Sequence, residues 1–157
     1  MNKQAWKQYA FWIVLAELVG GLSGWLTRGG AALYKETIRK PPLSPPGAVF
    51  PIVWTALFAL MGVGAARVAM APASQARSQG VRIFLLQLAF NFFWSVLFFN
   101  FQRFGLALLW LIALWLLIVR MILLFRKTDR LAARLQLPYL LWVAFAAYLN
   151  LGVWVLN

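Results

Sequence analysis

Few side chains in this sequence could carry conventional acid–base, nucleophilic or metal chemistry. The chain contains no histidine and no cysteine, and its only acidic residues are Glu17, Glu36 and Asp129. General acid–base catalysis usually draws on histidine or on paired carboxylates, and zinc or haem ligation depends mainly on histidine and cysteine. The composition therefore disfavours a conventional enzyme and a zinc site, and it excludes disulfides and a thiol nucleophile.

Amides recur at regular spacing inside one apolar stretch. Gln87, Asn91 and Ser95 follow one another at intervals of four, which places them on one face of a helix, and Trp94 lies on the same side. One interpretation is hydrogen bonding between neighbouring helices. The other is the polar wall of a cavity, and the spacing alone favours neither.

Two further apolar stretches carry aromatic faces at helical spacing. Their residues are Phe50, Trp54, Phe58 and Met61 in the one, and Trp142, Ala146 and Leu149 in the other. Such stripes more often serve helix packing or lipid contact than ligand binding. Flat hydrophobic ligands nevertheless gain from stacking on indoles, so the faces are also candidate walls of a binding site.

Glu17 is an acidic residue inside the first apolar stretch, where a charge is costly. It could couple proton movement to transport, or it could be a hydrogen-bonded structural group, which is the favoured interpretation. Gly20 and Gly24, which follow it, form a small-xxx-small pair suited to close helix approach. That approach could occur within one chain or between the two chains of a homodimer.

The composition as a whole indicates a membrane protein. Hydrophobic residues make up 64% of the 157 residues and charged ones 11%, whereas soluble domains have about 45–50% and about 25%. The net charge of +12 could suggest nucleic acid. The basic residues lie between apolar runs, however, where they would meet lipid headgroups, so we predict a bilayer partner and no nucleic acid.

Five stretches are long and apolar enough to cross a bilayer, which requires about 20 residues: 6–26, 49–70, 81–101, 105–125 and 135–156. The first is expected to be a retained helix, because it exceeds a signal-peptide h-region, contains Glu17 and precedes no A-x-A-like site. Short connections favour antiparallel neighbours. We therefore predict an all-α integral membrane protein, one domain over residues 1–157 built as a five-helix bundle.

Basic residues are divided unequally between the two ends of this bundle. Ten of the 15 share the N-terminal end: Lys3, Lys7, Arg67, Arg77, Arg82, Arg120, Arg126, Lys127, Arg130 and Arg134. The remaining five, which complete the 15, are Arg28, Lys35, Arg39, Lys40 and Arg103. The positive-inside rule then predicts a cytoplasmic N-terminus and a C-terminus outside.

The long first connection, residues 28–46, ends in a proline-rich stretch, KPPLSPPGAVFPIVW at 40–54, with five of the seven prolines. Pro51 suits the first turn of the next helix, where a missing N–H costs little. The preceding segment is expected to act as a stiff lid. Its cations, which suit carboxylates, are Arg28, Lys35, Arg39 and Lys40. With the tryptophans, they suggest a site for a planar, amphipathic, acidic molecule.

Three motifs resemble the tryptophan-rich sensory protein/translocator protein family, also called peripheral-type benzodiazepine receptors. KPPLSPPG at 40–47 with VFP at 49–51 and Trp54 is similar to the family's K-P-x-W-x-P-P…V-F-P…W signature. QLAFNFFWS at 87–95 resembles its Q-L-x-x-N-x-x-W-S segment. PYLLW at 138–142 with AAYLN at 146–150 resembles its P-Y-L-x-W…A-x-Y-L-N ending, and ELVG at 17–20 fits the first helix.

The resemblance implies a five-helix bundle whose ligand cavity is capped by the first connection. Family members bind porphyrins such as protoporphyrin IX and haem, and isoquinoline-carboxamide and benzodiazepine-type ligands; the resemblance implies no required cofactor beyond a porphyrin ligand. The implied ligand-binding residues are Tyr34, Pro45, Phe50, Trp54, Phe58, Gln87, Asn91, Trp94, Ser95, Trp142, Ala146 and Leu149. Trp54 and Trp142 match the tryptophans associated with light-dependent porphyrin breakdown, and are the only catalytic candidates.

The chain departs from the family pattern at several positions. Leu43 replaces the tryptophan of the proline motif, and Tyr34 stands one residue further from Lys40 than expected, which weakens its role in the cap. Position 92 is Phe, where some relatives have Gln. No basic residue follows Trp154, as the cholesterol motif of animal members requires, so cholesterol is not the predicted ligand.

The resulting leading hypothesis is a tetrapyrrole-binding membrane protein acting in porphyrin sensing, sequestration or transport. The first alternative is light-dependent porphyrin degradation through a radical on Trp54 or Trp142, which needs no acid, base or metal. The second is a small proton-coupled multidrug exporter built on Glu17. Such exporters usually have four helices and fewer tryptophans.

Overall fold

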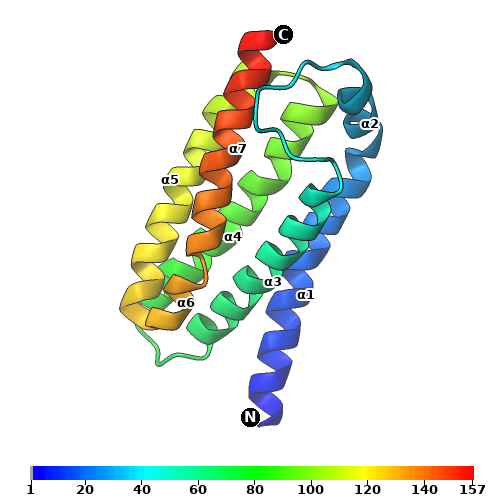
Figure 1. Ribbon diagram of the computed structural model, residues 1–157. Helices are drawn as coiled ribbons and strands as arrows, with labels where there is room; N and C mark the ends of the chain where they lie inside the picture. Colours follow the sequence, from blue (N-terminus) through cyan, green and yellow to red (C-terminus); the bar gives the residue numbers. More distant parts are fainter. Residues whose placement is uncertain (1) are drawn as a thin grey trace.

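Five long apolar helices run along the long axis of the molecule in the computed structural model, which describes residues 2–157 (Figure 1). The elements are α1 (Lys3–Leu26), α2 (Arg28–Thr37), α3 (Val49–Ala69), α4 (Gln75–Ser95), the π-helix η1 (Val96–Asn100), α5 (Phe104–Thr128), α6 (Arg130–Arg134) and α7 (Leu137–Leu156). The membrane-crossing stretches correspond to α1, α3, α4 with η1, α5, and α6 with α7. The predicted all-α bundle of five spanning helices is confirmed.

Several helices extend beyond their apolar stretches. Asn2 caps α1, its side chain accepting a hydrogen bond from the Ala5 N–H at 2.8 Å, and Ser74 caps α4 through the Arg77 N–H at 3.0 Å. Side chains of this kind satisfy the free N–H groups of a first helical turn. These end turns are polar, so hydropathy alone places the helix ends too far inward.

The first connection contains a helix that the sequence pattern does not predict. α2 follows α1 almost directly, and Gly30 within it lies against the chain at Phe99, where a Cβ would come within 2.6 Å of the carbonyl carbon. The ammonium of Lys40 lies near the C-terminal carbonyls of α2, 3.3 Å from that of Lys35. The remaining segment, residues 38–48, is the part we call the cap loop.

Glycines allow α1 and α3 to pack closely. A Cβ on Gly62 would overlap the backbone of Ile13, and a Cβ on Gly20 would lie 2.6 Å from Cδ2 of Phe58. Gly24 has open space around it. Gly20 thus serves packing within one chain, while Gly24 remains on the surface.

The next most extensive close backbone contacts join α4 to α5 and α5 to α7, and smaller ones join α4 to α1 and to α3. Figure 1 shows the cap loop crossing near the upper part of α7, and it shows the two chain ends at opposite ends of the bundle. α3 and α7, by contrast, have hardly any close backbone contact. Large side chains bridge these two helices instead.

An ion pair joins α3 to the linker between α5 and α6. The Arg67 guanidinium lies 3.0 Å from Asp129 Oδ2, and Asp129 Oδ1 also accepts the Ala132 N–H at 2.9 Å, which caps α6. Burial by itself raises the pKa of Asp129, but the Ala132 N–H and the Arg67 guanidinium outweigh burial and hold it below its usual value. Asp129 therefore serves as a charged anchor at the N-terminal end of the bundle.

Candidate ligand-binding site

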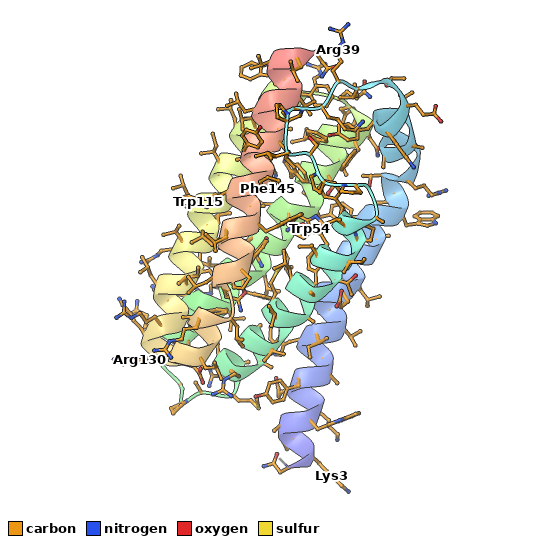
Figure 2. All side chains as sticks on the ribbon, in the orientation of Figure 1. Lys3, Arg39, Trp54, Trp115, Arg130 and Phe145 are labelled. Carbon is orange, nitrogen blue, oxygen red and sulfur yellow. The ribbon has the colours of Figure 1, made fainter. Side chains whose placement is uncertain are left out.

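Aromatic side chains of α3 and α7 meet between the two helices. The Trp54 ring lies 6.2 Å from that of Tyr139 and 5.5 Å from that of Phe58, and the Phe50 ring lies 5.9 Å from that of Trp142. Figure 2 shows Trp54 on the α3 side of this space. The rings touch edge to face or tilted, the arrangements that aromatic pairs favour, so the two predicted aromatic faces do come together.

The predicted amide face of α4 is buried and bonded to α7. The Tyr139 hydroxyl donates to Gln87 Oε1 at 2.6 Å and accepts from Asn91 Nδ2 at 2.8 Å. Gln87 Nε2 also approaches the Met61 sulfur at 3.8 Å. Both amides therefore join helices, as the helix-packing interpretation expected, and Tyr139 connects them to the Trp54 ring.

A second polar contact lies nearer the C-terminal end of α7. Trp94 Nε1 donates to Asn150 Oδ1 at 3.1 Å, and Asn150 Nδ2 donates to the Phe104 carbonyl at 2.8 Å. Ser95 is half-buried, and its hydroxyl makes no hydrogen bond within residues 2–157. Trp94 is thus anchored by its indole N–H and presents only its ring to a ligand.

Trp142 is a buried indole whose N–H has no partner among the described residues. Its Nε1 is buried and makes no hydrogen bond within the described part of the chain, while its ring contacts Phe50 and Phe145. A buried N–H without an acceptor costs about 1–3 kcal/mol. The group is therefore available to an acceptor on a bound molecule. Ala146 and Leu149, each 7% exposed, continue this face of α7.

The cap loop is tied to the end of α7. The Asn157 side chain accepts from the Arg39 N–H at 3.1 Å and donates to the Arg39 carbonyl at 2.8 Å. The Pro41 ring lies against Gly152, where a Cβ would approach Cγ to 2.5 Å. These contacts fix the start of the loop over the end of the bundle.

Further along the loop, the Tyr148 hydroxyl donates to the Pro42 carbonyl at 2.7 Å, and Pro45 is half-buried. Leu43 has a φ of 70° and is 82% exposed. A leucine in this left-handed region is strained. Its side chain projects away from the bundle, so the residue that replaces the family's tryptophan does not contact the candidate site.

Tyr34 lies on α2 and packs against the π-helix. Its ring centroid is 5.4 Å from those of Phe98 and Phe99, and the Lys40 ammonium lies 4.9 Å above it. Burial raises the pKa of its hydroxyl, so the phenol stays neutral. The structure does not group Tyr34 with the rings of Trp54 and Trp142.

Two of the four cations predicted to meet ligand carboxylates have partners within the protein. Lys40 bonds the carbonyls at the end of α2, and the Arg28 guanidinium stacks on the Trp25 ring at 4.4 Å. Lys35 and Arg39 are exposed. Lys40 therefore caps α2 rather than remaining free for a ligand carboxylate, because cations stabilise helix C-termini.

Tyr139 is the central residue that the sequence analysis did not place in the site. It is fully buried and bonds two α4 amides while touching Trp54. Its position was available as a signal, because it lies three residues before Trp142 and seven before Ala146, on one helical face. The acidic candidate Glu17 is half-buried on α1 and forms no hydrogen bond or ion pair within residues 2–157.

Comparisons with known proteins agree with these motifs. The model of the TspO/MBR family matches residues 12–155. The tryptophan-rich protein TspO of Chlorobaculum tepidum is 38% identical over all of this chain and 99% of its own length. Protein CrtK of Rhodobacter capsulatus is 34% identical, covering 87% of this chain and 85% of its own length.

The translocator protein of Bos taurus is 29% identical to this chain, over 95% of it and 89% of the bovine protein. These relatives and the five apolar helices describe an integral, multi-pass membrane protein. On the family match and the full-length similarity, the chain belongs to the TspO/MBR family.

Proposed function

We propose that this protein binds tetrapyrroles such as protoporphyrin IX or haem within the membrane, in porphyrin sensing, sequestration or transport. The observation that carries the proposal is the aromatic contact between α3 and α7, in which Trp54 lies against Tyr139 and Phe50 lies against Trp142. Within residues 2–157, the buried N–H of Trp142 has no partner. These rings can exchange their contacts with one another for stacking on a flat macrocycle at little cost in free energy, because both are aromatic contacts. Trp142 would then donate to an acceptor on the ligand.

The surroundings support an amphipathic ligand. The cap loop covers this end of the bundle, and the exposed cations Lys35 and Arg39 lie in the same connection, where they can meet carboxylates at the aqueous edge. Isoquinoline-carboxamide and benzodiazepine-type molecules combine flat rings with a carbonyl acceptor. They would suit the same indoles.

A tryptophan substitution tests the binding proposal. In the Trp54→Leu, Trp142→Leu double variant we expect affinity for protoporphyrin IX to fall about tenfold or more, because each lost aromatic contact is worth about 0.5–1.5 kcal/mol. Binding is followed by the shift in porphyrin absorbance, which does not depend on how many tryptophans remain. Trp6→Leu, Trp25→Leu removes two exposed indoles as a control. Equal affinity in both double variants would refute this site.

Light-dependent porphyrin degradation is a second candidate, favoured by the Trp54–Tyr139 contact at 6.2 Å. A tyrosine beside a tryptophan can return an electron that the indole gives to an excited porphyrin. Comparing porphyrin absorbance over time in illuminated samples and in samples kept dark separates degradation from binding. Porphyrin absorbance that fades no faster with the wild-type protein than in detergent alone would exclude this activity.

We also propose that the N-terminus is cytoplasmic and the C-terminus lies outside, since the ten-to-five division of basic residues separates the two ends. The cysteine-free sequence makes the test direct. A single cysteine at Lys3 should resist a membrane-impermeant maleimide in intact cells, whereas one at Val155 should react. The reverse pattern would invert the topology.

A further inference from the structure

Cations from α5 and α6 surround two adjoining hollows on the surface of the bundle. The first has a volume of about 410 Å³ and is lined by Arg120, Leu123, Arg126, Lys127 and Arg130. The second, of about 310 Å³, is lined by Ile122, Arg126, Arg130, Ala133, Arg134 and Leu137. Arg126 and Arg130 belong to both, and Figure 2 shows Arg130 at the end of the bundle formed by α5 and α6.

These cations have no acidic partner in the described part of the chain. Their side chains form no ion pair and no hydrogen bond within residues 2–157. Asp129, their neighbour in sequence, is bonded to Arg67 and to the start of α6. Glu17 and Glu36 lie on α1 and α2. The cluster is therefore electrostatically unbalanced and attracts an anion from outside the protein.

Arg120 indicates which anion this would be. It lies eight residues before the end of α5, about 12 Å along the helix axis, and it is exposed on the same stripe as Ile112, Leu116 and Leu123. Its charge therefore starts below the headgroup level and must extend toward it. The stripe also offers an apolar track that leads away from the hollow into the hydrocarbon.

We propose that the two hollows bind the headgroup phosphate of an anionic phospholipid, whose acyl chains lie along the Ile112–Leu116–Leu123 stripe of α5. A guanidinium group can donate two parallel hydrogen bonds to a phosphate, and it tolerates partial burial better than an ammonium group. Basic pockets at a membrane surface are known to select such headgroups. A free phosphate would use the cations but not the stripe.

The same end of the bundle supplies a matched control. Lys3, Lys7 and Arg82 are exposed cations that line neither hollow. Removing them lowers the net charge by three, as does Arg120→Gln, Arg126→Gln, Arg130→Gln. General attraction of a positive end to an acidic membrane would respond alike to both changes, whereas a specific site responds to one.

The test titrates purified protein in neutral detergent with a short-chain phosphatidylglycerol, and follows the thermal unfolding midpoint and lipid adducts in native mass spectrometry. We expect phosphatidylglycerol to raise the midpoint of the wild-type protein and of Lys3→Gln, Lys7→Gln, Arg82→Gln. In the arginine triple variant its affinity should fall at least tenfold. Phosphatidylcholine should have little effect on any of them.

Three outcomes would overturn the proposal: equal weakening in both triple variants, equal stabilisation by phosphatidylcholine, or inorganic phosphate acting as strongly as phosphatidylglycerol. The last would assign an anion site that is not a lipid site. Arg126→Lys, Arg130→Lys keeps the charge and protects against a folding failure of the triple variant. It should lose part of the affinity, because lysine cannot bind phosphate through two parallel donors, and undiminished affinity in it would refute guanidinium recognition.

Discussion

Gly62→Leu is expected to separate α1 from the rest of the bundle. A Cβ at this position would overlap the backbone of Ile13, whose nitrogen lies 2.7 Å from it. A flexible side chain could rotate away, but a helix backbone cannot, so α1 as a whole must move. Overpacking a well-packed contact costs about 1–3 kcal/mol, and occasionally more; the backbone overlap places Gly62→Leu at or above the upper end.

The measurement is the thermal unfolding midpoint in detergent, followed by circular dichroism, together with the rate of proteolysis within α1. Gly62→Ala should show a smaller loss in the same direction. Gly21→Leu is the control, since it is the same chemical change on α1 at a position with open space around it. Midpoints that fall equally in Gly62→Leu and Gly21→Leu would contradict close α1–α3 packing.

Tyr139→Phe has the second largest expected effect. It removes one hydroxyl but leaves two buried amides, Gln87 and Asn91, without their partner. Hydrogen bonds between membrane helices average about 0.6 kcal/mol and reach about 1.7, so the loss of two should lower the free energy of unfolding by about 1–3 kcal/mol. Unfolding in a denaturing detergent measures this change.

Two further variants show whether the unpaired amides are the cause. Tyr148→Phe also removes a hydroxyl, but one that bonds an exposed loop carbonyl, so its effect on stability should be small. Adding Gln87→Leu and Asn91→Leu to Tyr139→Phe should restore part of the stability, because replacing all partners by apolar groups removes the desolvation cost. A triple variant less stable than Tyr139→Phe alone would show that the unpaired amides are not the cause of the destabilisation.

The helices could be predicted because the bilayer imposes one length and one chemistry on every crossing. α2 could not be predicted, because Arg28, Gly29 and Gly30 resemble a break in the sequence. The close approach of Gly30 to Phe99 belongs to the tertiary structure. From the sequence alone, a glycine that ends a helix cannot be distinguished from a glycine that allows close packing of a neighbouring segment.

For the site, the sequence predicted which residues share a helix face but not which residues of other helices they contact. Spacing placed Gln87 and Asn91 on one face, but periodicity does not give the rotation of one helix against the next. The spacing also placed Tyr139 on the face of Trp142 and Ala146, but its pairing with these two amides required the structure. The charge of Lys40 was evident in the sequence, whereas its use as a cap for α2 required the position of that helix end.

The scarcity of backbone contact between α3 and α7 has a mechanical consequence. α3 packs closely against α1, where glycines allow the approach, and α7 packs closely against α5. Around Trp54 and Trp142, α3 and α7 meet through aromatic rings, so these two helices can separate there by a hinge motion that breaks no hydrogen bond within a helix. We therefore expect a flat molecule to enter from the side, out of the hydrocarbon, rather than past the cap loop, which Asn157 holds at Arg39.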